Sequence, residues 1–288
     1  MEPINQTIEP HAPIKAVLHP TDFSEGSAIA FQHALRLALL TKSKLKILSV
    51  ASDGSEKNFP GVRETLERWQ LLPKDSPRSA LAKLGIDACK ITSKHNDPVE
   101  AVLKFLKARP IDLVVLATHE HKGRAAWLGK SVAQPLARRA AEMTLFIPDN
   151  SDGFVAEADG SVSLQRILIP VAQTPRPQPA VDAVCRLVTA LKCPQGAFTL
   201  MHVGQSNGMP RIRRWDVPGW EWKKELRTGE VIQSIISTAN EIDADLVVMA
   251  TDGRSGFMEG LRGSHSERVL REAGVPLLTV PAFVPNEQ

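Results

Sequence analysis

The sequence has few cysteines, no long hydrophobic run and no block of basic residues, and each lack excludes a class of protein. Its three cysteines, Cys89, Cys185 and Cys193, are odd in number and form no C-x-x-C pair, which favours a reduced cytoplasmic protein. No apolar run approaches the roughly 18 residues of a membrane span. The first residues also lack the hydrophobic region of a secretory signal. We therefore expect a cytoplasmic protein without a membrane partner.

The charge of the chain is nearly balanced. The net charge is +3 over 288 residues, and the densest basic cluster is RIRR at 211–214. Such a short cluster is typical of a solvated loop, so we expect no nucleic-acid partner. With 43% hydrophobic residues, the length predicts two domains with ordinary cores.

The stretch 245–281 contains a strand, a glycine-rich loop, a helix and a second strand in order. The apolar run 246–249 after Asp245 is typical of a strand buried on both faces. Four glycines follow, at Gly253, Gly256, Gly260 and Gly263. Ser264 and Glu267 have the spacing of a helix capping box, and LLTV at 277–280 indicates the second strand. Such a loop directs backbone N–H groups and the positive end of the helix dipole at one point, which favours a phosphate.

This stretch is the second copy of an internal duplication. DLVV occurs at 112–115 and again at 245–248, and the segments that follow align without a gap to Pro148 and Pro281. In the earlier parts of the two copies, Pro20 aligns with Pro170. Each copy alternates strands and helices, which predicts an α/β fold with a doubly wound parallel sheet. In such a sheet, ligands bind beyond the carboxyl ends of the strands.

The boundaries follow from this repeat. We predict a tail at 1–12, a first domain at 13–149, a linker at 150–164, a second domain at 165–283 and a tail at 284–288. The linker is acidic, polar and glycine-containing. In the first domain, strands are expected at 14–19, 44–50, 86–92 and 112–118, with helices at 24–40, 61–72, 76–84 and 97–107. In the second domain, strands are expected at 166–173, 198–203 and 219–226, with helices at 178–191 and 229–242.

Two motifs resemble those of the universal stress protein family. The pattern Ala250-x2-Gly253-x9-Gly263-Ser264 is similar to the family's nucleotide loop, with Ala250 in place of its first glycine. The stretch strand–PTDFS–helix–strand at the start of the first copy is the second match. The resemblance implies a tandem protein of two Rossmann-like domains, related to the adenine nucleotide alpha hydrolases. It also implies that an adenine nucleotide such as ATP, with Mg²⁺ accompanying it, binds in the crevice.

Carried over residue by residue, the resemblance marks a set of nucleotide-binding positions in each copy. In the second copy they are Pro170, Val203, Met249, Ala250, Gly253, Gly263, Ser264 and Ser266. In the first copy they are Pro20, Asp22, Val50 and Ala117. Two other readings stay open: the glycine loop is a structural turn without ligand, and Asp22 is an Asx-turn residue at the entry to a helix.

Each copy keeps the part of the site that the other has lost. In the first copy, Glu120 stands in place of the second glycine and Lys130 aligns with Gly263. Because a carboxylate repels a phosphate, we expect poor nucleotide binding there. In the second copy the loop is nearly whole, but Ala172 replaces Asp22. We therefore expect binding mainly in the second domain.

Other patterns in the sequence give weaker evidence of function than these two motifs. Gly123-x5-Gly129-Lys130-Ser131 differs from a P-loop in the glycine spacing, and His119 and His121 do not fit H-E-x-x-H, so no metal site is assigned. No catalytic set is visible, which leaves a weak ATPase as the third hypothesis.

The first hypothesis is a stress sensor or effector that binds a nucleotide. The alternative is a scaffold that binds a protein partner or a second copy of this chain. The resemblance also predicts that the edge strands at 145–148 and 277–281 pair antiparallel into an intramolecular pseudo-dimer.

Overall fold

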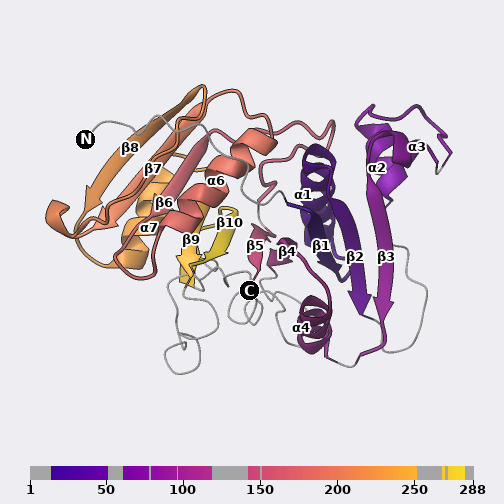
Figure 1. The fold of residues 1–288 in the computed structure, drawn as a ribbon, viewed down its shortest axis with the longest axis horizontal. Coiled ribbons are helices and arrows are strands. Elements are labelled where there is room, and N and C mark those ends of the chain that lie inside the picture. Colours follow the sequence, from indigo (N-terminus) through magenta and orange to yellow (C-terminus); the bar gives the residue numbers. More distant parts are fainter. Residues whose placement is uncertain are drawn as a thin grey trace. The chain divides into compact units, whose positions relative to one another are not determined.

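The computed structural model describes residues 14–50, 61–77, 79–95, 97–118, 142–149, 151–251, 268–269 and 272–282. The chain divides into two compact units (Figure 1). Apart from Glu142 and Met143, which group with the C-terminal unit, the described residues up to Val162 form the N-terminal unit, and the C-terminal unit continues from Ser163. The change of unit falls inside the stretch 150–164 that the sequence analysis interprets as a linker.

The N-terminal unit is a five-stranded sheet with helices. Its sheet order is β3-β2-β1-β4-β5, and the neighbours β1 and β2, β1 and β4, and β2 and β3 are parallel. Its elements are β1 (Ala16–Thr21), α1 (Glu25–Thr41), β2 (Lys44–Val50), α2 (Val62–Arg68), α3 (Ala80–Lys83), β3 (Asp87–Ser93), α4 (Pro98–Ala108), β4 (Leu113–Thr118) and β5 (Met143–Pro148).

The C-terminal unit repeats this order as β8-β7-β6-β9-β10, with all neighbours parallel. Its elements are β6 (Arg166–Pro170), α6 (Gln178–Ala190), β7 (Gly196–Val203), a 3-10 turn (Ser206–Gly208), β8 (Trp220–Arg227), α7 (Val231–Glu241), β9 (Leu246–Thr251) and β10 (Leu277–Pro281). Helices α6 and α7 cover opposite faces of its sheet (Figure 1). The prediction of two doubly wound α/β domains is confirmed.

Local signals place the helix starts where the sequence predicts them. Ser24 caps α1 by accepting a hydrogen bond from the Ser27 N–H at 3.1 Å. Asp97 caps α4 by accepting from the Val99 N–H at 2.8 Å, and Pro98 occupies the first turn, where no backbone donor is needed. In the C-terminal unit, the alternating stretch GWEWKKEL forms the edge strand β8, as predicted.

The aspartate of each DLVV segment ties the start of one strand to its neighbour. Asp112 Oδ2 accepts hydrogen bonds from the Lys15 and Ala16 N–H groups, at 2.8 and 2.9 Å. Asp245 Oδ2 accepts from Gln165 and Arg166 at 2.9 and 2.8 Å. The strand registers also correspond, with Val17 beside Leu113 in the first copy. The duplication in the sequence is therefore a duplication of hydrogen bonds.

A buried histidine joins three elements of the N-terminal unit. His19, on β1, is fully buried, and its Nδ1–H donates to the Val115 carbonyl of β4 at 2.9 Å. Its Nε2 lies 3.5 Å from the hydroxyl of Ser27 on α1. Burial lowers the pKa of His19 to about 4, partly opposed by the Val115 carbonyl and by Asp22. The ring is therefore neutral in the folded unit.

The predicted linker contains buried apolar residues. Phe154 and Val155 are 1% and 2% exposed, and Val155 forms an antiparallel bridge with Val162. These residues pack with the N-terminal unit. The antiparallel pairing predicted for the last strands concerns the placement of the units relative to each other, and it stays a prediction.

We predict that Asp112→Ala and Asp245→Ala each destabilise their own unit by about 2 kcal/mol, because each leaves two backbone donors without a charged acceptor. Urea unfolding, monitored by hydrogen exchange in each unit, measures the change in the free energy of unfolding. Asp87→Ala is the control, since Asp87 forms an exposed pair with Lys44 at 3.9 Å and should change stability by under about 0.5 kcal/mol. Equal effects of all three variants would contradict the assigned role.

We also predict that the N-terminal unit loses stability on acidification through His19. Its folded pKa of about 4 lies below its ordinary 6.5, so its contribution is complete above pH 6.5 and is lost as the pH falls toward 4. Between pH 7 and 5 the loss is about 2 kcal/mol, and His19→Gln should remove it. Hydrogen exchange of β1 and β2 at both pH values measures the effect. An unchanged pH dependence in His19→Gln would refute it.

Candidate functional site

The predicted nucleotide positions of the N-terminal unit lie at the carboxyl ends of its strands. Pro20 is half-buried near the end of β1, and Val50, the last residue of β2, is 7% exposed. Ala117 is the penultimate residue of β4 and is 9% exposed. Because β1 pairs with both β2 and β4 in parallel, these three ends meet at one edge of the sheet.

Asp22 forms the turn that leads from this edge into α1. Its Oδ1 accepts hydrogen bonds from both the N–H and the Oγ–H of Ser24, at 3.0 and 2.7 Å. This is the turn geometry that the sequence analysis left open beside ligand binding. Next to it, the Thr21 and Ser27 hydroxyls lie 2.8 Å apart, and the Ser27 hydroxyl also contacts His19 Nε2. Asp22 thus has a structural role, and its contact with a ligand stays a prediction.

A second carboxylate lies at the same place, and the sequence analysis did not find it. The Asp149 side chain packs against Gly26 in the first turn of α1, so closely that a Cβ on Gly26 would collide with it. The same Cβ position lies 3.6 Å from the Ala117 side chain. Asp149 therefore places a carboxylate beside a predicted nucleotide position. Asp149 directly follows β5, and a carboxylate at the end of a strand is the feature by which the sequence could have indicated it.

The described positions of the C-terminal site lie in the equivalent places. Pro170 and Val203 are the last residues of β6 and β7, and both are half-buried. Met249 is 7% exposed on β9, and Ala250 beside it is half-buried. Strands β6 and β9 are parallel neighbours, which brings the ends that carry Pro170 and Met249 to the same edge.

Two hydrogen bonds join the loop after β6 to the end of β7 and to the loop that follows β7. His202 Nδ1–H donates to the Val171 carbonyl at 2.9 Å, and the Gln173 side-chain amide donates to the Gly208 carbonyl at 3.1 Å. Gly204 has φ +135°, and a Cβ on it would lie 3.2 Å from His202 Nε2. These residues lie at or beyond the carboxyl ends of β6 and β7, and no motif in the sequence marked them.

Part of the predicted site lies outside the described residues. These positions are Gly253, Gly263, Ser264 and Ser266, together with Glu120, Lys130 and the histidines His119 and His121. Their roles stay predictions. The described residues on either side fit the expected order, because β9 ends at Thr251 and residues 268 and 269 are helical.

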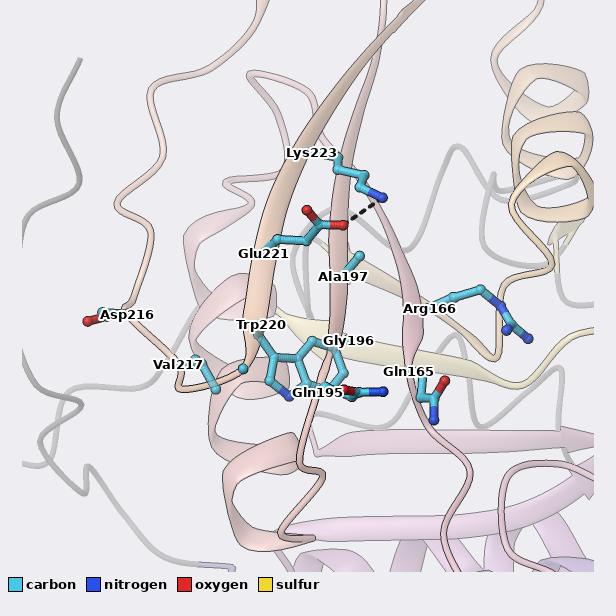
Figure 2. A pocket seen from close by; sticks show the side chains of 11 residues that line it. Gln165, Arg166, Gln195, Gly196, Ala197, Asp216, Val217, Trp220, Glu221 and Lys223 are labelled. Atoms are coloured by element: carbon cyan, nitrogen blue, oxygen red, sulfur yellow. Dashed lines mark ion pairs between the residues drawn. The ribbon is translucent and has the colours of Figure 1, made fainter.

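The cavity in Figure 2 lies at the opposite edge of the C-terminal sheet, by the amino ends of β6, β7 and β8. Its volume is about 620 Å³, and no predicted site residue lines it. Three of its charged groups are paired: Glu221 with Lys223 at 2.7 Å, and Arg166 with Asp245, which lies outside the lining, at 2.8 Å. Because this edge is not where open α/β sheets bind ligands, the crevice remains the candidate site.

The described part of the chain shows neither a metal-binding cluster nor a membrane-spanning helix. It contains no group of three or more histidine, cysteine, aspartate or glutamate side chains that could hold a metal ion. None of its helices is long and apolar enough to cross a membrane.

Solved structures with the same fold come from archaea and bacteria. A universal stress protein from Archaeoglobus fulgidus superposes with a TM-score of 0.59 at 18% identity, covering 93% of this chain and 98% of that one. A putative universal stress protein from Pseudomonas aeruginosa gives 0.59 at 12% identity, with 93% of each chain covered. At these identities the likeness concerns the fold.

The sequence comparisons identify the family. A universal stress protein of Methanocaldococcus jannaschii is 31% identical over 80 residues, which are 26% of this chain and about half, 47%, of that relative. The profile of the Universal stress protein family matches residues 13–148 and 211–281, so most of both units is covered. The chain belongs to the universal stress protein family.

Proposed function

We propose that this protein binds an adenine nucleotide such as ATP, mainly in its C-terminal unit, and acts in the cytoplasm as a stress-response sensor or effector. Mg²⁺ would accompany the phosphates. The proposal depends on the glycine loop between β9 and the following helix, whose N-terminus favours an anion. The chain offers no catalytic set by which we would assign an enzymatic reaction.

One observation supports the choice of the C-terminal unit. Asp149, whose carboxylate lies by Gly26 and Ala117 in the N-terminal unit, aligns with Ala282 in the second copy. Glu120 in the first loop likewise aligns with Gly253. A polyphosphate therefore meets less negative charge in the C-terminal crevice. Two like unit charges in close contact near a protein surface repel each other by several kcal/mol.

In the C-terminal unit, Ala172 stands where the first copy has Asp22, and hydrogen bonds organise the end of the crevice that we assign to adenosine. The bonds from His202 to Val171 and from Gln173 to Gly208 hold the loop after β6 to the end of β7 and to the loop after β7. Val203 is the last residue of β7, is half-buried and directly precedes Gly204. We propose that the ribose or base lies over Val203 and the phosphates lie at Gly253, Gly263 and Ser264.

Calorimetric titration with Mg-ATP tests the proposal. Gly253→Glu and Gly263→Lys import residues of the first copy, and each should weaken binding at least tenfold, or about 1.4 kcal/mol. Gly85→Glu is the matched control, because it adds the same charge as Gly253→Glu at a position with no neighbouring atom within 4 Å of a Cβ. Asp22→Ala should leave the main heat unchanged. Equal heats in wild type and Gly253→Glu, or no heat in either, would end the proposal.

Mass spectrometry of the purified protein after denaturation gives an independent measurement. Co-purified ATP, AMP or a related nucleotide is the expected result. A protein without nucleotide that also shows no heat with Mg-ATP would favour the scaffold hypothesis. Accumulation of ADP from added ATP would favour the ATPase.

A further inference from the structure

Residues 151–162, which we call the clasp, dock on helices α1 and α2 of the N-terminal unit. The clasp folds back on itself, with the Val155–Val162 bridge and a hydrogen bond from Ala156 N–H to the Ser161 carbonyl at 2.9 Å. Phe154 and Val155 are almost fully buried although the stretch is acidic and polar. The clasp therefore has a specific place on the unit instead of being a free linker.

The first attachment is the imidazole of His33 on α1. His33 Nδ1–H donates to the Ile29 carbonyl of its own helix at 2.9 Å. Its Nε2 accepts the backbone N–H groups of Phe154 and Val155, at 2.9 and 3.2 Å. The ring also meets Phe154 edge to face, with 4.8 Å between centroids. Two donors that point at one nitrogen require that nitrogen to be unprotonated.

The second attachment is Trp69 at the end of α2. Its indole N–H donates to the Glu157 carbonyl at 3.0 Å. Gly160 packs on the ring so closely that a Cβ there would come within 2.5 Å of it. Arg68 pairs with the Glu157 carboxylate at 2.9 Å, but both groups are exposed, so the pair contributes little.

We propose that the clasp is an acid-sensitive catch, docked while His33 is neutral and released when His33 takes up a proton. Protonation would place an N–H of the ring against the Phe154 and Val155 N–H groups, so the docked form excludes it. Release uncovers the Trp69 indole and frees residues 151–162 from α1 and α2. This device is independent of nucleotide binding.

The sign of the effect follows from His33. Burial lowers its pKa to about 4 in the docked state, partly opposed by the Ile29 carbonyl, against 6.5 for an exposed ring. Docking is therefore complete above pH 6.5 and weakens as the pH falls toward 4. The two values predict that the opening equilibrium rises roughly 30-fold between pH 7.5 and 5.

Other charged groups lie on the elements that pack around His33. They are Arg36 on α1, Arg68 on α2, and Asp152, Glu157 and Asp159 on the clasp. Hydrogen bonds from Ser161 lower the pKa of Asp159, and Arg36 lowers it further, so Asp159 stays charged as His33 titrates. The arginines are cationic throughout.

Hydrogen exchange of the full-length protein at pH 7.5 and 5 tests the proposal, with each rate divided by its intrinsic rate. In wild type, protection of the Phe154 and Val155 amides should fall about 30-fold. In His33→Gln it should change less than about threefold, because the amide oxygen accepts hydrogen bonds without titrating. The proposal is overturned if both proteins change equally. The same measurement in a His19→Gln background removes the titration of the core, and there the proposal is also overturned if the β2 amides lose protection in parallel with the clasp, since the whole unit would then be opening.

A second pair of variants tests the contact itself. Gly153 has φ +69°, and a Cβ on it would collide with His33 Nε2. Gly153→Ala should lower protection at Val155 at least tenfold at pH 7.5 and remove most of the pH dependence. Gly85→Ala is the control, because Gly85 has nearly the same φ, +73°, but no atom within 4 Å of a Cβ. Equal clasp protection in the two variants would refute the His33 attachment.

Discussion

The hydrogen bonds from one aspartate to two consecutive backbone N–H groups determine where each candidate site lies. Asp112 and Asp245 follow the crossover helices α4 and α7 and hold the first residues of β1 and β6. They thereby set the register of the central strand pair in each unit. Because parallel strands in register end at the same edge, this anchoring at the amino ends also fixes which residues meet at the carboxyl ends.

On this shared frame the two copies differ chiefly in charge at the crevice. In the N-terminal unit, Asp22 shapes the entry to α1, and Asp149 packs on Gly26 beside Ala117. The second copy has alanine at both aligned positions, Ala172 and Ala282, and hydrogen bonds between neighbouring loops organise its crevice instead. The two copies therefore share one backbone frame and present different side chains at the crevice.

The N-terminal unit also contains two fully buried neutral histidines, which serve different contacts. His19 joins β1, β4 and α1 beneath the crevice, whereas His33 joins α1 to the clasp. In both, Nδ1–H donates to a backbone carbonyl, which leaves Nε2 as an acceptor. Burial keeps each ring neutral at neutral pH. Acid therefore acts on this unit both through its core and through an outer attachment.

The sequence by itself determined the strands, the helix starts and the duplication, because these depend on local signals. Ser24 and Asp97 cap the helices that directly follow them, and the apolar runs at 112–118 and 245–251 predict buried strands without knowledge of their neighbours. The family motif added the positions at the strand ends, since these follow from strand order.

The tertiary structure decided which distant residues meet. The side chain of His33 contacts backbone groups 121 and 122 positions away, and Asp149 packs on a glycine of α1. Acidic, polar composition made 150–164 resemble a linker, because composition does not reveal that a helix surface accepts Phe154. Such contacts depend on how helices are placed on the sheet, and that placement is a property of the packed unit and not of any local stretch.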